Sequence, residues 1–276
     1  MSKDNPYQSD IDLILSHRHD NGADFWATPD NRLYVGSPYS TTNSAMMLYE
    51  LGVPAAHEAM AGAASLVLAC WRKDGRYSLG PSGTLHPCYT AAAANVLCRL
   101  GYAGDERLER TFTHLLESQH TDGGWRCGKF FYGRGPETEF SNPGATLGVL
   151  DAFRFTGYLN TEEKLDRAVE SLLRHWETRL PLGPCHYGIG TQFLRVEYPF
   201  MKYNILYYVY VLSHYVYARQ DGRFLAALAH LKSRLRDGEV VVENTNRMLK
   251  GLEFCRKGAV SAQATTRYRE ILANML

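Results

Sequence analysis

The stretch YTAAAANVLCRLG, residues 89–101, indicates the fold of this chain. It begins with small residues, continues in an apolar pattern of helical period, and ends at a glycine suited to a left-handed helix C-cap. The stretches TTNSAMMLYELG (41–52) and GATLGVLDAFRFTG (144–157) follow the same order. Their closing glycines, Gly52, Gly101 and Gly157, lie 49 and 56 residues apart. A recurrence at this spacing is typical of a repeat architecture.

A second helix of a different kind follows these stretches. Residues 105–119 and 160–176 each place apolar side chains on one helical face and charged side chains on the other. The apolar faces contain Leu108, Phe112, Leu115 and Leu116 in the first case, and Leu165, Val169, Leu172 and Leu173 in the second. Glycine-bearing turns then follow, as in WRKDGRY (71–77), QHTDGGWRC (119–127) and LRDGEVV (235–241). We therefore expect an all-α fold in which the nearly uncharged helices are enclosed by the amphipathic ones.

Composition excludes several classes of protein. The chain has 276 residues, of which 45% are hydrophobic, so it can bury a sizeable core. Lys and Arg number 30 against 29 Asp and Glu, and no basic run stands out, which disfavours a nucleic-acid partner. The first 20 residues are polar and no later segment has the length of a transmembrane span, so we predict a cytoplasmic protein. Walker and dinucleotide-binding motifs are absent, and no nucleotide cofactor is expected.

The segment LLESQHTDGGW, residues 115–125, resembles the Gln-x-x-Asp-Gly-Gly-Trp repeat of squalene–hopene cyclases and of the β-subunits of protein prenyltransferases. The repeat pattern extends this resemblance to most of the chain, although only residues 119–125 match the motif closely. The resemblance implies an α/α toroid, a barrel of inner helices inside a ring of outer helices. We expect one domain, residues 1–276, with a lead-in over 1–36 and about five helix-pair repeats at roughly 37–80, 85–128, 141–190, 198–240 and 258–276.

A metal site is the sharpest structural hypothesis. The segment HPCYT, residues 86–90, resembles the Asp-x-Cys-Tyr-Ser zinc site of prenyltransferase β-subunits, but His86 replaces the aspartate and Asn142 lies nearest to the family's histidine ligand. Because zinc prefers thiolate and imidazole ligands, cysteines in equivalent loops could complete a site, with iron as the other candidate metal. The predicted ligands are Cys88, Cys127 and Cys185, with His86 or His186 as the fourth. The alternative is that these cysteines only pack in the core.

Three carboxylates are the candidate catalytic groups. The Asp-x-Asp-Asp acid motif of the cyclases is absent from this chain. Glu137 and Glu139 flank Thr138, where two close carboxylates could raise the pKa of one of them, or could both simply be solvated. Asp151 lies in an apolar helix and needs a partner if it is buried, and Arg154, three residues later, is the expected one.

Aromatic residues suggest a substrate pocket. In residues 198–218, Tyr203, Tyr207, Tyr210 and His214 have the spacing of one helical face, and Tyr89 opens another helix. Such rings could stabilise a cation, or they could belong to an ordinary core.

The predicted function is a prenyltransferase- or terpene-cyclase-like enzyme that acts on an isoprenoid or other apolar substrate in the central cavity. Two alternatives stay open, a non-catalytic module that binds a hydrophobic ligand and a toroid with a purely structural metal. A single toroid of this length also leaves room for a protein partner or a second copy of the chain.

Overall fold

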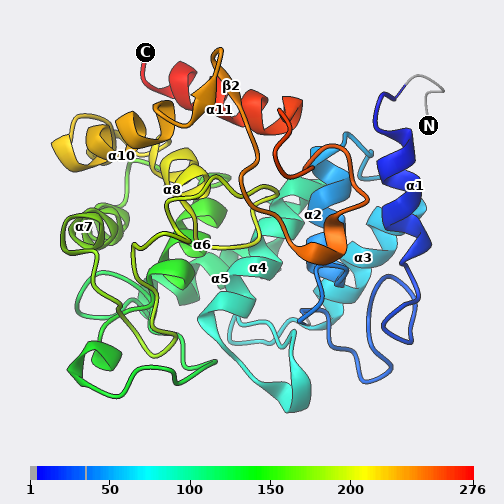
Figure 1. Cartoon of the computed structure of the whole chain (residues 1–276). Coiled ribbons are helices and arrows are strands. Elements are labelled where there is room, and N and C mark those ends of the chain that lie inside the picture. The colour runs from blue at the N-terminus through cyan, green and yellow to red at the C-terminus, as the bar shows by residue number, and fades with distance from the viewer. Residues whose placement is uncertain (1–4, 35) are drawn as a thin grey trace. The chain divides into compact units, whose positions relative to one another are not determined.

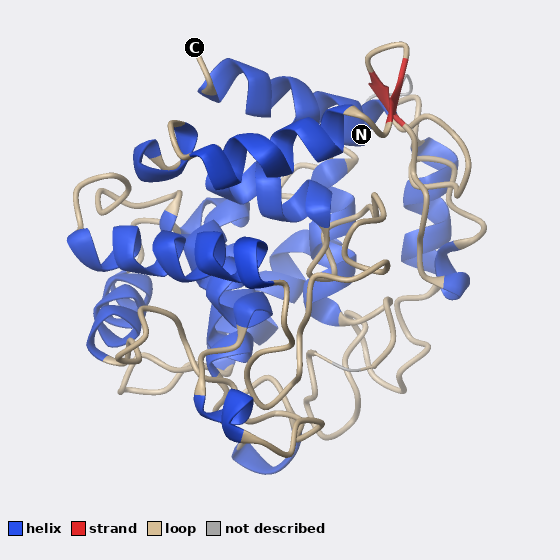
Figure 2. Ribbon diagram, turned by 60° about the vertical axis from the view of Figure 1, so that its left-hand side comes forward, coloured by secondary structure: helices blue, strands red, loops and turns tan. Residues whose placement is uncertain are grey.

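The computed structural model describes residues 5–34 and 36–276, which are mostly helical (Figure 1). The helices are α1 (Gln8–Ser16), α2 (Thr41–Glu50), α3 (Glu58–Ala69), α4 (Pro87–Leu97), α5 (Glu106–Glu117), α6 (Pro143–Phe153), α7 (Glu163–Thr178), α8 (Ile205–Leu212), α9 (Val216–Arg219), α10 (Gly222–Lys232) and α11 (Ala262–Asn274). Strands β1 (Leu235–Arg236) and β2 (Glu239–Val240) form a short antiparallel hairpin, visible in red in Figure 2. The predicted mostly helical class is confirmed. No helix in the described residues is long and apolar enough to cross a membrane.

The chain divides into two compact units, which are described separately. The first unit comprises residues 1–114 and 246–256, and the second comprises residues 115–245 and 257–276. The division falls inside α5, and residues 246–256 belong with the amino-terminal part of the chain.

In the first unit, α2 packs against α1, α3 and α4, and α3 also packs against α4. A buried carboxylate joins residues 246–256 to α1. Asp10 accepts hydrogen bonds from the backbone N–H groups of Glu253 at 2.9 Å and Phe254 at 2.8 Å. These bonds satisfy a side chain that is only 3% exposed, as a buried charge requires.

In the second unit, helices of two kinds pack together. Helices α6 and α8 are apolar and buried almost all round, whereas α7 is amphipathic and buries one face. Helix α6 packs against α7 and α8, and α8 also packs against α10 and α11. The predicted buried face of α7 is confirmed, since Leu165, Val169, Leu172 and Leu173 are at most 1% exposed.

One turn geometry recurs in both units and supports the repeat predicted from the sequence. In three glycine turns, a backbone N–H two residues after the glycine donates to the hydroxyl of a threonine in the next helix of the unit. The pairs are Tyr77 and Thr90 at 3.3 Å, Trp125 and Thr146 at 3.1 Å, and Val240 and Thr265 at 3.0 Å.

In two of these turns, those of Gly75 and Gly123, glycine is required by conformation and by space. Gly75 and Gly123 have φ values of +92° and +95°, which side chains with a Cβ rarely adopt. A Cβ on Gly75 would lie 2.6 Å from the carbonyl oxygen of Arg110, and one on Gly123 would lie 2.5 Å from that of Arg167. Each turn therefore packs directly against the backbone of a neighbouring helix, α5 or α7.

The segment around Gln119 connects α5 to α7. The side-chain amide of Gln119 donates to the carbonyl oxygens of Gly123 at 2.6 Å and Lys164 at 2.7 Å. The indole N–H of the buried Trp125 donates to the carbonyl of Leu115 at 2.9 Å. The Gln and Trp side chains of this motif thus satisfy carbonyl groups near the end of α5 and the start of α7.

One predicted helix end is wrong. Gly52 and Gly101 take the expected positive φ after their helices, but Gly157 does not. Helix α6 already ends at Phe153, with Arg154 as its C-cap, so Gly157 lies beyond the helix terminus.

Candidate functional site

The candidate site in the second unit is centred on Asp151, near the end of α6. Its side chain is 2% exposed and forms an ion pair with Arg154, whose side chain is 9% exposed. Both Nε and Nη2 of Arg154 lie 2.7 Å from Oδ1 of Asp151. The partner predicted from the sequence is confirmed, because residues three apart on a helix lie on the same face.

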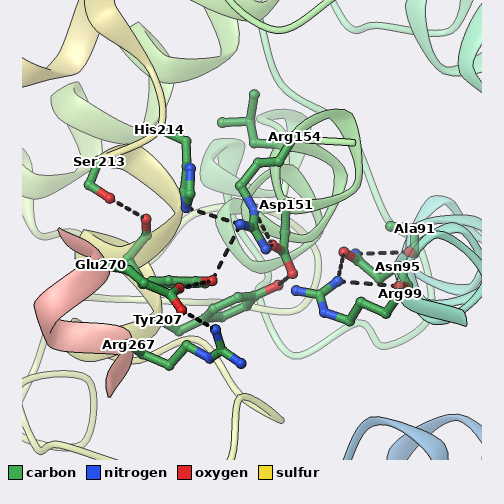
Figure 3. Close-up of polar contacts among 12 residues, drawn as sticks. Ala91, Asn95, Arg99, Asp151, Arg154, Tyr207, Ser213, His214, Arg267 and Glu270 are labelled. Carbon is green, nitrogen blue, oxygen red and sulfur yellow. Dashed lines mark hydrogen bonds and ion pairs between the residues drawn. The ribbon is translucent and has the colours of Figure 1, made fainter. Parts of the chain in front are cut away.

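Helix α8 contributes two tyrosine hydroxyls. Tyr207 donates to Oδ2 of Asp151 at 2.9 Å, so the carboxylate is held on both oxygens (Figure 3). Tyr210 donates to Oε2 of Glu270 at 2.8 Å and accepts from Nη1 of Arg154 at 3.3 Å. The predicted tyrosines of α8 therefore meet the predicted aspartate of α6.

Helix α11 supplies a second ion pair, which the sequence analysis missed. Glu270 pairs with Arg267 on the same helix (Figure 3). Asn274 donates to the hydroxyl of Ser213 at 2.9 Å. The only sequence signal was an Arg–Glu spacing of three residues, which is common on exposed helices. Packing of α11 against α8 places this pair beside Tyr210.

His214 closes the network as a neutral imidazole. Nη1 of Arg154 lies 3.0 Å from Nε2 of His214. Because a guanidinium can only donate, Nε2 of His214 accepts this hydrogen bond. Burial lowers the pKa of His214 to about 4, and the neighbouring Arg154 charge acts in the same direction.

The pKa shifts of Arg154 and Glu270 favour the charged form of each group. Burial by itself would lower the pKa of Arg154, but Asp151 outweighs burial and the pKa is raised. Burial by itself would raise the pKa of Glu270, but Arg267 and the Tyr210 hydroxyl outweigh it and the pKa is lowered. Burial raises the pKa of Tyr210 to about 12. The network therefore joins two arginines, Arg154 and Arg267, to two carboxylates, Asp151 and Glu270, in two ion pairs.

Stacked aromatic rings adjoin these charges. The Phe200 ring centroid lies 4.9 Å from that of Tyr207 and 5.0 Å from that of Tyr210, at small interplanar angles. The guanidinium carbons of Arg154 and Arg267 lie 4.8 Å and 5.9 Å from the Tyr210 centroid. The ring of Tyr210 thus already has cationic partners within the protein.

The predicted tyrosine stripe is wrong at Tyr203. Helix α8 begins at Ile205, after Asn204, whose side chain caps it, so Tyr203 precedes the helix. The Tyr203 hydroxyl lies 2.9 Å from Nδ1 of His175, and Nε2 of His175 lies 3.0 Å from the carbonyl of Leu180. Tyr203 therefore belongs to a separate buried pair, in which burial lowers the pKa of His175 to about 4.

Glu137 and Glu139 have separate partners in a short 3₁₀ turn, Pro136–Glu139. Glu137 accepts from the backbone N–H groups of Gly135 at 3.0 Å and Arg134 at 3.1 Å. These bonds lower the pKa of Glu137, the opposite of what a neutral acid requires. Glu139 pairs with Arg126 at 3.2 Å. A catalytic role for this pair stays a prediction, and the structure adds no support to it.

The predicted metal ligands fall in both units. In the first unit, His86 precedes α4, Cys88 lies in its first turn, and the buried Tyr89 ring stands 5.2 Å from that of His86. In the second unit, Sγ of Cys185 lies 3.6 Å from the carbonyl oxygen of Cys127.

The structure also places His186 and Asn142, which the metal hypothesis named. His186 is exposed at a positive φ of 57°. Asn142 caps α6 by accepting from the N–H of Ala145 at 3.0 Å. Over residues 5–34 and 36–276, no group of three or more His, Cys, Asp or Glu side chains is placed to hold a metal ion.

Comparisons with known proteins leave the family open. A scan against protein-family models finds no match, and a search of curated proteins finds no similar sequence. Among solved structures, the crystal structure of a protein from Actinoplanes is similar over 96% of this chain and 82% of that chain, with 16% sequence identity and a TM-score of 0.44. So weak a similarity carries no argument about function.

Proposed function

We propose that the chain is an enzyme that acts on a neutral isoprenoid or similarly apolar substrate, and that its helix pairs form an α/α toroid. The recurring turn, with its positive-φ glycine and its N–H to threonine hydrogen bond, supports a repeat of the toroid type. The buried and amphipathic helices of the second unit have the character expected of inner and outer helices.

The observation that carries the proposed activity is the placement of Asp151. A carboxylate on an otherwise uncharged, buried helix is costly unless it is paired, and this one has both the Arg154 guanidinium and the Tyr207 hydroxyl. Next to it stand the stacked rings of Phe200 and Tyr207. An anion beside aromatic faces is suited to stabilising a developing positive charge on an apolar substrate.

Asp151 is better suited to accept a proton than to start a reaction by donating one. The adjacent Arg154 cation and the Tyr207 hydroxyl both favour the ionised carboxylate. In the proposed reaction, an alkene of the substrate gains a proton from solvent, the carboxylate stabilises the positive charge that results, and it then takes up the proton that is lost when the product alkene forms. Tyr207 orients the carboxylate through its hydrogen bond to Oδ2.

The charge balance of the network favours an uncharged substrate. Two arginines and two carboxylates neutralise one another within the protein. A diphosphate bound here would compete with Asp151 and Glu270 for the same guanidinium groups. We therefore place the apolar part of a substrate, and not a phosphate group, against this network.

A metal at Cys127 and Cys185, with other ligands, remains a separate proposal. The thiol of Cys185 contacts the backbone carbonyl of Cys127, but the described residues contain no group of three candidate ligands around them. The proposed reaction uses no metal. Elemental analysis of untagged protein purified without chelator tests this point, with Cys127→Ala and Cys185→Ala as comparisons.

The activity is tested by incubating the purified chain with squalene, and in parallel with farnesyl and geranylgeranyl diphosphate, and analysing the products by gas chromatography and mass spectrometry. We expect a product from squalene or another neutral isoprenoid, and an approximately 100-fold or greater loss of turnover in Asp151→Asn. Glu163→Gln, an exposed change on α7, is the matched control. Turnover of the diphosphates alone would contradict the neutral-substrate proposal.

The second candidate function is a binding module without catalysis. It is favoured by one observation, that the charged groups of the network and the ring of Tyr210 already have partners inside the protein. Saturable binding of squalene, without any product and with unchanged affinity in Asp151→Asn, would establish this alternative.

A further inference from the structure

Cys127 and Cys185 meet in the second unit although 58 residues separate them in the sequence. Cys127 follows Trp125 by two residues and is 1% exposed, and Cys185 is half-buried in the turn between Leu182 and Tyr187. Sγ of Cys185 lies 3.6 Å from the backbone carbonyl oxygen of Cys127. A disulfide needs two cysteines whose Cα atoms lie within about 7 Å of each other, and contact between the thiol of one and the backbone of the other is compatible with that requirement.

Backbone hydrogen bonds hold the two cysteine-bearing segments together. The N–H of Tyr132 donates to the carbonyl of Pro184, and the N–H of Gly183 donates to that of Glu137, both at 2.9 Å. Leu182 and Tyr187 also form a bridge across the turn that contains Cys185. The approach of the two segments is therefore part of the folded arrangement.

The pair also adjoins the start of the helix that carries the candidate site. The side chain of Asn142 caps α6 by accepting from the N–H of Ala145. A Cβ on Gly183 would lie 3.0 Å from Cα of Asn142, so the turn packs directly on this cap. Asp151 lies two turns further along the same helix.

We propose that Cys127 and Cys185 form a reversible disulfide, a redox site that links residues 128–140 to the turn 182–187 at the start of α6. The oxidant is a low-molecular-weight disulfide. Contact with Cys127 and burial raise the pKa of Cys185, so the small fraction present as thiolate at pH 8 attacks one sulfur of the small disulfide, and one small thiolate leaves. Cys127 loses its proton to solvent and attacks Sγ of Cys185, and the second small thiolate leaves. The protein gives up two electrons and two protons, and the small disulfide becomes two thiols.

This inference does not depend on the proposed isoprenoid chemistry. It does exclude simultaneous use of the same sulfurs as metal ligands, because ligation requires thiolates. Oxidation should stiffen the exposed segment that contains Phe130, Phe131 and Tyr132. It should also stabilise the fold, because the cross-link reduces the conformational entropy of the unfolded chain.

The test uses the full chain, reduced, freed of reductant and incubated with oxidised glutathione at pH 8. After quenching with N-ethylmaleimide and denaturation, we expect the thiol count to fall from the six cysteines of the sequence to four. Peptide mass spectrometry should show a link between the peptides of Cys127 and Cys185 that dithiothreitol removes. The oxidised protein should melt about 5–10 °C higher and be cleaved more slowly within residues 128–140.

Variants separate this pair from the other thiols. Cys185→Ser should abolish both the link and the rise in melting temperature, whereas Cys70→Ser, at another half-buried cysteine, should still lose two thiols on oxidation. The peptide map is made on the chain without substitutions, so it tests for the disulfide even if a variant misfolds. A glutathione adduct on Cys185 without the link, six unreacted thiols, or zinc bound stoichiometrically through Cys127 would overturn the proposal.

Discussion

The hydroxyl of Tyr207 on α8 donates a 2.9 Å hydrogen bond to Oδ2 of Asp151 on α6. This bond joins the two apolar helices of the second unit through a polar contact. Because Arg154 occupies the other carboxylate oxygen, the three side chains fix the orientation of one buried anion. The contact is therefore the most direct place to separate a catalytic from a purely structural role.

Tyr207→Phe removes the hydroxyl and keeps the ring. We expect a loss of about 1.5–3 kcal/mol in the free energy of unfolding, since the bond is made to a charged group. We also expect lower turnover with little change in KM, because the oriented carboxylate acts on the reacting atoms. Tyr217→Phe, an exposed tyrosine, is the control, and its effect should be small. Equal effects of the two changes in urea unfolding would show that the Tyr207 bond contributes nothing.

Asp151→Asn leaves the Arg154 guanidinium largely buried without its counter-ion. Breaking a buried pair in this way should cost about 3–5 kcal/mol of unfolding free energy. The double variant Asp151→Asn, Arg154→Met should recover a large part of that loss, since it removes the uncompensated charge. Chemical denaturation of the single and double variants measures the coupling between them. Additive losses would mean that the two residues do not act as a pair.

Stability should fall as the pH drops from about 6.5 to 4. His175 and His214 each have a pKa lowered to about 4, so between these values the unfolded chain binds protons that the folded chain does not. Each histidine then contributes a loss of roughly 1 kcal/mol per pH unit. The ring of His214 contacts Arg154 and Asn274, and the charges of Asp151, Glu270 and Arg219 also act on its pKa. The ring of His175 contacts Tyr203.

Single variants assign that pH dependence. His175→Gln and His214→Gln should each flatten the curve of unfolding free energy against pH between 6.5 and 4. Exposed His186→Gln is the control and should leave the slope unchanged. A slope between pH 6.5 and 4 that neither variant alters would contradict the assignment to these histidines. Carboxylates with a lowered pKa, such as Glu270, lose their contribution only at lower pH, between their ordinary pKa and the lowered one.

Gly123→Ala should destabilise the fold by about 2 kcal/mol or more. The new Cβ would meet the Arg167 carbonyl at 2.5 Å, and the φ of +95° strains any residue with a side chain. Gly157→Ala is the matched control, because nothing lies within 4 Å of its Cβ position and its φ is not positive. Thermal unfolding should place Gly157→Ala at or above the parent. Similar melting temperatures for both variants would contradict the close approach of this turn to α7.

Thr146→Val should leave the buried N–H of Trp125 without its acceptor and cost about 1–3 kcal/mol. Thr146→Ser keeps the hydroxyl and should cost much less. Thr265→Val removes the corresponding acceptor from Val240 and should have a comparable effect. If Val and Ser at position 146 destabilise equally, the loss comes from packing and not from the recurrent hydrogen bond.

The sequence by itself determined the features that act within one helix or one turn. Apolar residues at helical spacing predicted the buried face of α7 and, except for the half-buried Leu116, that of α5. The spacing of three residues predicted that Arg154 pairs with Asp151. Glycine before Tyr77 and Trp125 predicted the turns, because a positive φ is a local requirement. Local geometry, set by the backbone, is sufficient for these features.

Tertiary structure decided which helices meet and which side chains therefore share a site. Asn204 caps α8, so Tyr203 leaves the stripe of Tyr207 and joins His175 instead. The packing of α11 on α8 brought in Glu270, which no pattern had indicated. Cys127 and Cys185 meet across 58 residues through the turn at Gly183. Periodicity defines the face of each helix, but the contact between two faces depends on how their side chains pack, and that is a property of the whole fold.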